Sequence, residues 1–282
     1  MPEGPELRHS RDHLRQVLCG RHYPAVKFEI LGGRYVKEPF DGYEHLNERL
    51  NRSMLTDPYV VYHVDTKGKF MWWTLASSRD KFYFWTTYGM SGAWMDTPTR
   101  HSAVSFEYSP TLPRKVYFND QRRFGTLKAV FSDDEMRAKL DTLGPDMLDA
   151  PALELFISRM RKIKQERQIA EALLDQRIVS GVGNYIRAEG LYRAKLSPFR
   201  KISELTDYDL SILRDSIILV MRESYEARGN SFSTYRTADG KQGNFKDFLR
   251  VYGRKHDPFG SLVTRELADD GRAVWWCKDV QR

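Results

Sequence analysis

The sequence changes character once, near Ser132, and this change limits the folds open to the chain. Before it, short runs rich in β-branched and aromatic residues alternate with turn residues, most clearly at 25–30, 59–62, 69–73 and 115–118. Such spacing predicts the short antiparallel strands of a β-sandwich or barrel. After it, up to about Gly229, acids and bases are interspersed among Leu, Ile and Met, which indicates helices. We therefore expect an α+β protein built in two halves.

Two stretches have the periodicity of amphipathic helices. In residues 5–20 the apolar side chains recur at helical spacing and the run stops at Gly20, which suits a helix terminus. In residues 205–227 a stripe of Leu, Ile, Val and Met predicts the clearest helix of the chain. Two short strands at about 262–267 and 272–277, joined by an Asp-Asp-Gly turn, predict a C-terminal β-hairpin.

With 282 residues the chain has room for two modest domains. We expect an N-terminal β-sandwich domain at 1–132, a linker at 133–150, and a helical domain at 151–282 whose last part, about 251–282, holds the hairpin. The formal charge is +7 although the chain has 38 acids, so the excess base matters only where it is clustered, and basic clusters do occur at 114–115, 122–123, 159–167 and 250–256. This favours a polyanionic partner, nucleic acid first. For the basic run at 159–167, a solvated surface is the favoured interpretation.

Several classes of protein are disfavoured. The two cysteines, Cys19 and Cys277, provide neither a disulfide framework nor a self-sufficient cysteine metal site. No run is long and apolar enough to span a membrane, so we expect no membrane partner. The N-terminus carries Glu3 and Glu6 rather than the basic, then apolar, pattern of a secretion signal. We expect an intracellular protein.

The first seven residues place a potential secondary amine beside two carboxylates. If Met1 is removed, the nitrogen of Pro2 becomes an α-amine, whose ordinary pKa of about 8 leaves it substantially unprotonated near neutral pH. Such an amine can attack a sugar aldehyde carbon and form an iminium, while Glu3 and Glu6 move the protons. The alternative is an ordinary first helical turn, with Pro and acid at its start. On these residues alone the alternative is favoured.

A glycine-rich segment lies at 180–185, between two helical stretches. Gly181 and Gly183 would let backbone N–H groups approach a ligand, and a helix that begins at about Tyr185 would present its N-terminus to an anion. Asn184 could add a side-chain donor to a phosphate. A tight turn between helices is the alternative, and it is favoured for this glycine pattern by itself.

These segments together resemble the Fpg/Nei family of bifunctional DNA glycosylases. The resemblance runs along the whole chain and rests on five motifs in the family's order: PEGPE at 2–6, GMSG at 89–92, NDQRRFG at 119–125, SGVGNY at 180–185 and VYGRK at 251–255. It implies a β-sandwich followed by a helix-two-turn-helix domain with a C-terminal finger. It also implies excision of an oxidised base from double-stranded DNA, then β,δ-elimination, by a DNA-associated monomer that needs no cofactor.

The resemblance assigns catalytic roles at the N-terminus and in one strand. Pro2 would attack the anomeric carbon of a flipped nucleotide, and Glu3 would assist proton transfer to the sugar oxygen. Glu6 is the second acid of the motif. Lys69 falls on the family's active-site lysine and would hold the phosphate beside the lesion. Its alternative is a solvated strand lysine.

The resemblance also assigns residues that grip DNA. The wedge that fills the hole left by a flipped base would consist of Met90, Arg122 and Phe124. Phosphates would be contacted by Asn184, Arg272 and Arg123. For Met90 and Phe124 the alternative is core packing, and for Arg272 it is an ordinary exposed arginine on a hairpin.

The finger departs from the zinc-binding members of the family. Those carry two Cys-x-x-Cys pairs, whereas this chain has Phe259 and Leu262 at the first pair and Cys277 and Val280 at the second. One thiolate cannot hold a structural zinc ion, so we expect no metal. The hairpin resembles the zincless finger of some Nei-like members, and Cys277 is expected to be a relic or a small buried residue. Packing of the hairpin is expected from Leu262, Val263, Val274, Trp275 and Trp276.

The substrate and two other functions stay open. Gly4 and the zincless finger resemble Nei-like members, so we expect oxidised pyrimidines, hydantoins and abasic sites rather than 8-oxoguanine. In the family, the polar loop at 230–248 lies over the flipped base, and we expect this loop to select the lesion. One alternative is a non-catalytic nucleic-acid-binding module. Against it argues the presence of four residues that phosphate binding alone does not need: Pro2, Glu3, Glu6 and Lys69. The other is a lyase for abasic sites with little glycosylase activity.

Overall fold

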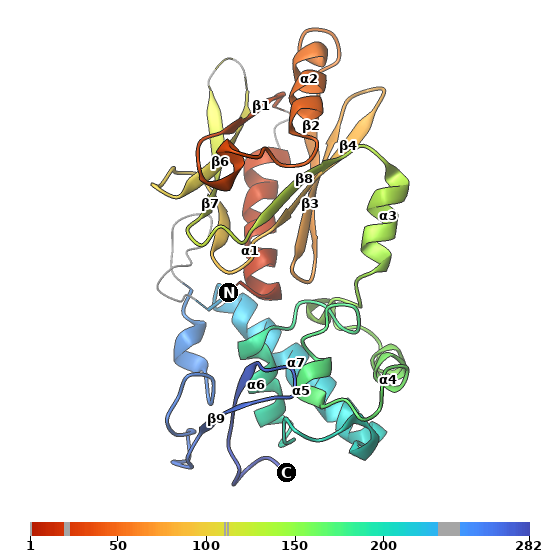
Figure 1. The fold of residues 1–282 in the computed structure, drawn as a ribbon, viewed down its shortest axis with the longest axis vertical. Helices are drawn as coiled ribbons and strands as arrows, with labels where there is room; N and C mark the ends of the chain where they lie inside the picture. The colour runs from red at the N-terminus through yellow and green to blue at the C-terminus, as the bar shows by residue number, and fades with distance from the viewer. Residues whose placement is uncertain (1, 20–22, 110, 112, 231–242) are drawn as a thin grey trace. The chain divides into compact units, whose positions relative to one another are not determined.

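The computed structural model describes residues 2–19, 23–109, 111, 113–230 and 243–282 (Figure 1). The described chain divides into two compact units. The sandwich unit comprises Pro2, Glu6–Asp141 and Gly243; the helical unit comprises Glu3–Pro5, Thr142–Asn230 and Asn244–Arg282. The division after Asp141 falls inside the range expected to be a linker, and the domain boundaries themselves stay a prediction.

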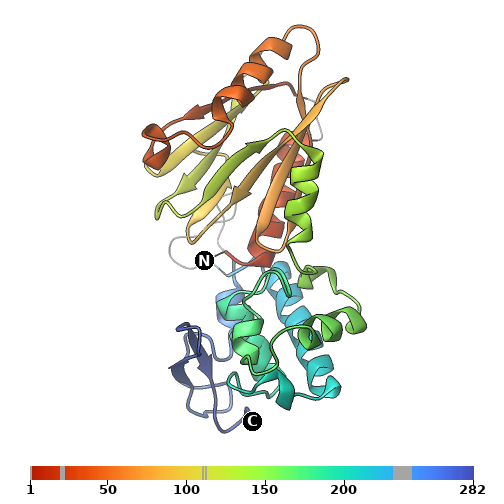
Figure 2. The ribbon, with the colours of Figure 1, turned by 45° about the vertical axis from the view of Figure 1, so that its right-hand side comes forward.

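Within the described residues, the sandwich unit contains two four-stranded antiparallel sheets (Figures 1 and 2). In spatial order, one sheet consists of β1 (Ala25–Ile30), β6 (Ser102–Tyr108), β7 (Arg114–Asp120) and β5 (Gly92–Met95). The other consists of β2 (Val60–Lys67), β3 (Phe70–Ala76), β4 (Lys81–Thr87) and β8 (Thr126–Val130). The predicted β-sandwich is confirmed, and so are the four strand regions named from the sequence.

Aromatic rings from both sheets form the core of the sandwich unit. The ring of Phe28 on β1 lies 4.4 Å from that of Phe84 on β4 and 4.6 Å from that of Phe106 on β6, measured between centroids. Trp73 and Trp94, one from each sheet, lie 4.7 Å apart. All five side chains are buried. Since burying one such side chain contributes about 1.5–3 kcal/mol, this cluster is a main source of the unit's stability.

In the part of the sandwich unit that the structure describes, three α-helices accompany the sheets. The N-terminal helix α1 (Gly4–Leu14) continues as a π-helical turn to Cys19, which confirms the helix expected at 5–20. Helix α2 (Tyr43–Ser53) is tied to β1, because the Asn47 amide accepts the Phe28 N–H at 2.8 Å and donates to the Phe28 carbonyl at 2.9 Å. Helix α3 (Asp133–Asp141) lies beside the sheet that contains β4 (Figures 1 and 2). It occupies the start of the range expected to be a linker.

The helical unit contains α4 (Leu153–Arg161), α5 (Ile169–Ala172), α6 (Asn184–Arg193) and α7 (Asp207–Glu226). The apolar stripe predicted at 205–227 is the buried face of α7. The helical half of the chain and the α+β class are therefore confirmed. None of the helices in the described ranges combines the length and the apolar character needed to cross a bilayer.

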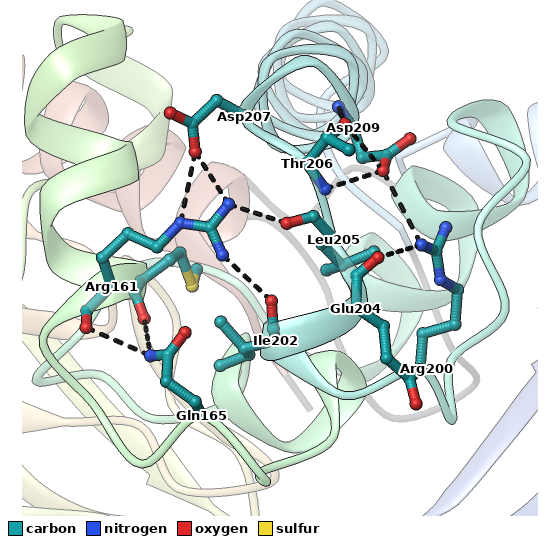
Figure 3. A network of polar contacts seen from close by, with 10 residues as sticks. Arg161, Gln165, Arg200, Ile202, Glu204, Leu205, Thr206, Asp207 and Asp209 are labelled. Carbon is teal, nitrogen blue, oxygen red and sulfur yellow. Dashed lines mark hydrogen bonds and ion pairs between the residues drawn. The ribbon is translucent and has the colours of Figure 1, made fainter.

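Figure 3 shows how the start of α7 is fixed. The guanidinium of Arg161, the last residue of α4, donates to the carbonyls of Ile202 at 3.0 Å and Leu205 at 2.7 Å and to the Asp207 carboxylate at 2.7 Å. Arg167 likewise pairs with acids of its own unit, Glu171 at 2.6 Å and Asp175 at 3.1 Å. The interpretation of 159–167 as a solvated surface is wrong for these two arginines, because both cross-link secondary structure.

The C-terminal hairpin consists of β9 (Thr264–Leu267) and β10 (Ala273–Trp276), paired antiparallel as predicted and joined through Gly271 at φ +73°. We call it the finger hairpin. It lies beside α6 (Figure 1) and packs through a buried cluster of Ala188, Tyr192, Val251, Val263 and Cys277.

The expected packing of the hairpin is correct for Val263, Val274 and Trp276, which are buried, and for the partly buried Trp275. It is wrong for Leu262, which is 59% exposed. Successive side chains along an extended chain point to opposite sides, so the neighbour of the inward-facing Val263 faces solvent. Among the residues that the structure describes, no three His, Cys, Asp or Glu side chains come together as a metal-binding group.

Candidate active site and nucleic-acid interface

The N-terminus of α6 holds the carboxylate of Glu3. Its Oε1 accepts the backbone N–H of Tyr185 at 3.0 Å, its Oε2 accepts that of Ile186 at 3.4 Å, and the residue is 2% exposed. The first N–H groups of a helix have no partner within it, and the helix dipole favours a negative charge there. The sequence predicts a helix that begins at about Tyr185, and the helix begins at Asn184. The sequence also predicts that this terminus binds a phosphate. The structure instead shows that its N–H groups bind an acid of the chain itself.

Glycines lie on both sides of this contact, and Gly183 leaves the space that the Glu3 carboxylate occupies. The Gly4 N–H donates to the Gly181 carbonyl at 2.9 Å, and Gly181 has φ +92°. A Cβ on Gly183 would lie only 2.1 Å from the carboxyl carbon of Glu3. A Cβ on Gly4 would lie 2.7 Å from the Met221 Cε. The alternative for the glycine-rich segment is a tight turn between helices. This alternative explains only part of the segment's structure, because Gly183 also leaves space for the Glu3 carboxylate.

The other residues expected near the reaction belong to the sandwich unit. Pro2 and Glu6 are both buried, and Glu6 stands in the first turn of α1. Lys69 is half-buried and is the second residue of the two-residue turn between β2 and β3, after Gly68 at φ +60°. Glycine at the first position suits such a hairpin turn. Lys69 is thus a turn residue and not the solvated strand lysine of the alternative; its role in catalysis stays a prediction.

Two turns of the sandwich unit are tied together where the wedge is expected. The Ser91 hydroxyl accepts the Arg122 N–H at 2.9 Å and donates to the Asp120 carboxylate at 2.8 Å. The same carboxylate accepts the Gly125 N–H at 2.7 Å. Because Ser91 and Asp120 are buried, these bonds fix the turn after β4 to the turn between β7 and β8.

The side chains that these turns present are exposed. Phe124 is 56% exposed and Met90 37%, so core packing, the alternative for both, is excluded. The Arg122 guanidinium lies 5.4 Å from the centroid of the Phe124 ring, within the range of a cation–π contact. Arg123, also exposed, has φ +60°. The two hydrogen-bonded turns therefore present two exposed apolar side chains, Met90 and Phe124, and two exposed cations, Arg122 and Arg123.

Arg272 and Asn184 lie in the helical unit. Arg272 is exposed and sits between the turn glycine and β10, with its Nε 3.9 Å from the Asp270 carboxylate. Asn184 is the first residue of α6, and its side-chain oxygen accepts a hydrogen bond from Arg187 at 2.5 Å. The structure leaves the phosphate-binding roles of both residues as predictions.

Comparisons with known proteins decide the family. Residues 1–127 match the family model described as the formamidopyrimidine-DNA glycosylase N-terminal domain, and residues 143–236 match its H2TH domain. The chain belongs to the Fpg/Nei family of DNA glycosylases. It is a base-excision-repair enzyme of a family that combines glycosylase and AP lyase activities, as its sequence predicts.

Curated relatives resemble this glycosylase along its whole length. Formamidopyrimidine-DNA glycosylase of Thermus thermophilus is 31% identical over 288 residues, covering 100% of this chain and 98% of its own. The enzyme of the same name from Desulfitobacterium hafniense is 29% identical over 291 residues, covering 100% of both.

Solved structures give the same result. The MutM (Fpg) protein from Thermus thermophilus superposes with a TM-score of 0.80 at 30% identity, covering 99% of this chain and 98% of its own. A complex between an LlFPG mutant and a THF-containing DNA superposes with a TM-score of 0.82 at 25% identity, covering 100% of both chains. The assignment to the Nei-like branch within the family stays a prediction.

Two buried charged residues of this glycosylase escape the sequence patterns. Glu189 is fully buried, and its carboxylate accepts the backbone N–H groups of Arg250, Val251 and Tyr252 at 2.9–3.1 Å. Arg187, on the same helix, is also fully buried. A signal was present: long charged side chains are almost never fully buried unless they are paired. The sequence, however, does not reveal that α6 is buried on every side.

Proposed function

We propose that this glycosylase removes oxidised pyrimidines and hydantoins in preference to 8-oxoguanine, and then cuts the strand through a Schiff base on Pro2. The observation that carries the proposed Schiff-base mechanism is the Glu3 carboxylate, fixed on the N-terminus of α6 by two backbone N–H groups. Glu3 directly follows Pro2 in the chain, so the residue next to the amine carries a carboxylate that is fixed in position. Pro2 acts only after Met1 has been removed, because an amide nitrogen is not nucleophilic.

The chemistry starts at C1′ of the flipped nucleotide. The lone pair of the Pro2 nitrogen forms a bond to C1′, and the bond from C1′ to the base breaks, so that the base leaves with the electron pair and takes up a proton from solvent. The Pro2 nitrogen gives its own proton to the Glu3 carboxylate. Glu3 passes this proton to the sugar ring oxygen, the ring opens, and the bond from nitrogen to C1′ becomes an iminium.

The iminium makes the neighbouring C2′ proton acidic. Loss of that proton expels the 3′ phosphate by β-elimination, and loss of the C4′ proton then expels the 5′ phosphate by δ-elimination. Glu6 shares in these proton transfers. Water finally hydrolyses the Schiff base and frees Pro2, so the cycle consumes no metal or redox cofactor.

Residues of both units contact the DNA in this proposal. Lys69, Asn184, Arg272 and Arg123 bind phosphates near the lesion, which makes the affinity fall steeply as the salt concentration rises. The wedge of Met90, Arg122 and Phe124 fills the space that the flipped base leaves. The exposure of both apolar wedge residues supports this role, because an apolar group that is not in the core is available to enter a base stack.

The preference for pyrimidine lesions rests on the likeness of Gly4 and of the zincless finger to Nei-like members. The names of the two curated relatives, by contrast, refer to formamidopyrimidine. Residues 231–242, most of the loop expected to select the base, lie outside the described residues. A direct comparison of substrates therefore decides the preference.

Borohydride trapping tests the proposal. Duplexes that carry thymine glycol, 8-oxoguanine or an abasic site are incubated with the enzyme and borohydride, and the covalent adduct is measured. Pro2→Gly and a form that retains Met1 are the controls. We expect more adduct from thymine glycol than from 8-oxoguanine, and little from either control. Absence of an adduct on all three duplexes would refute the Schiff-base mechanism, whereas trapping only at the abasic site would favour the lyase alternative.

A further inference from the structure

Arg187 is a fully buried cation that takes no part in the steps above. Its guanidinium donates to the side-chain oxygen of Asn184 at 2.5 Å, to the carbonyl of Ala273 at 2.8 Å and to the carbonyl of Ala170 at 3.2 Å. Its Nε meets no acceptor among the residues that the structure describes. A buried guanidinium with an unsatisfied N–H is costly for folding, and an apolar side chain of similar size would often serve stability equally well.

The three acceptors come from three different elements. Ala170 lies in α5, Asn184 starts α6, and Ala273 is the first residue of β10. Ala273 directly follows Arg272 in the chain. One guanidinium therefore holds the amide of Asn184 and the backbone next to Arg272.

The bond to Arg187 also orients the Asn184 amide. With the side-chain oxygen used as an acceptor, the NH₂ group is the donor side of the amide. It carries two hydrogens: one bonds the Tyr252 hydroxyl, and the other can meet a phosphate oxygen. Burial lowers the pKa of Arg187 to about 10, while the charges of Asp270 and Glu3 oppose that shift. Arg187 is therefore charged at neutral pH, and its bonds to the three carbonyl oxygens are charge-assisted.

We propose that Arg187 is a positioning residue that holds Asn184 and Arg272 so that both can bind phosphates of the same strand at the lesion. It contacts neither the DNA nor the reacting atoms. The inference rests on the proposed phosphate-binding roles of these two residues, and it assigns to Arg187 the coupling between α6 and the finger hairpin.

The salt dependence of DNA binding separates positioning from mere stabilisation. The dissociation constant for a duplex that carries a tetrahydrofuran abasic-site analogue is measured from low to moderate sodium chloride, at a temperature where thermal unfolding shows each variant to be folded. The loss of one phosphate contact made by a cation lowers the slope of log Kd against log salt by about 1, whereas the neutral amide of Asn184 adds affinity without adding to the slope. We expect Arg187→Met to lower the slope by that amount and to weaken binding by roughly tenfold, although Arg187 itself reaches no phosphate.

Two further variants complete the experiment. Glu189→Gln is the matched control, because Glu189 is equally buried on the same helix, but the hydrogen bonds that the structure describes for it run to the backbone at 250–252 and not to Asn184 or the finger strands. It should lower the melting temperature and keep the slope. Arg187→Lys keeps the charge but cannot reach three acceptors at once. It should show a smaller loss of slope, and it replaces Arg187→Met if that variant does not fold.

A double-mutant cycle with Arg272→Ala distinguishes the possible failures. We expect Arg272→Ala to lower the slope by about 1, and Arg187→Met to lower it no further in that background. A full slope in both Arg187 variants, or additive losses in the double variant, would overturn the positioning role alone. If Arg272→Ala itself leaves the slope unchanged, the proposed phosphate contact of Arg272 is wrong, and the role of Arg187 is overturned with it.

Discussion

Gly183→Ala should disable catalysis without straining the backbone. Gly183 has φ −126° and ψ −158°, an extended conformation that alanine adopts freely. The added methyl group, however, would lie 2.1 Å from the carboxyl carbon of Glu3 and 2.3 and 2.5 Å from its two oxygens. Glu3 must therefore shift by about 1 Å or leave the helix terminus, because close-packed interiors do not tolerate such an overlap.

The size of the effect follows from what Glu3 loses. Its bonds from the Tyr185 and Ile186 N–H groups are charge-assisted, and leaving a buried donor unsatisfied costs about 1–3 kcal/mol. A misplacement of about 1 Å in an active site can reduce the rate by about 100-fold. This corresponds to about 2.7 kcal/mol in the activation barrier. We expect base excision to slow by that factor, with a lower melting temperature but a folded protein.

Single-turnover excision on a thymine glycol duplex measures the rate, and thermal unfolding measures the stability. Gly32→Ala is the matched control: Gly32 has φ 175°, and its added Cβ would meet only the Ser102 carbonyl oxygen at 3.5 Å. That variant should retain the wild-type rate. If folded Gly183→Ala also excises at the wild-type rate, the position of Glu3 on α6 is irrelevant to the reaction and the reasoning is wrong.

Four other outcomes are expected. Gly4→Leu should lower the free energy of unfolding by about 1–3 kcal/mol, because its Cβ would lie 2.7 Å from the Met221 Cε, and Met221→Ala should restore part of the loss in chemical denaturation. Phe124→Ala should change that free energy by no more than about 0.5 kcal/mol, since the ring is exposed, but should reduce base flipping, followed by 2-aminopurine fluorescence. Arg177 holds the pKa of Asp175 well below its ordinary value, so the resulting stabilisation is present above about pH 4 and is lost as the pH falls through the folded-state pKa. Asp175→Asn should therefore lower the melting temperature at pH 7, and the difference from wild type should shrink below about pH 3. Treatment with a chelator should leave excision and trapping intact; loss of activity would contradict the zincless assignment.

Periodic features of the fold could be predicted from the sequence. The strand at 25–30 follows directly from a short run rich in β-branched and aromatic residues, and helix α7 from an apolar stripe, because each pattern is local. The finger hairpin was predictable for the same reason. Leu262 was not, because the register that turns Val263 inward and Leu262 outward is set by packing against α6.

The polar interior of the candidate site could not be predicted. The glycine-rich segment before α6 indicates an anion, but nothing local shows that the anion is Glu3, which lies 182 residues before Tyr185 in the chain. Arg187 and Glu189 have the composition of a solvated helix face, although both are fully buried. Their partners, Ala273 and the backbone from 250 to 252, meet them only in the tertiary fold.

The central claim is that the amine of Pro2, accompanied by the held carboxylate of Glu3, forms the bond to the sugar. The most direct test is mass spectrometry of the borohydride-trapped complex after proteolysis of the protein and digestion of the DNA. We predict that the sugar remnant is attached to the nitrogen of Pro2, in a peptide that lacks Met1. An adduct on Lys69 or on any other lysine, with Pro2 free and unmodified, would contradict the claim.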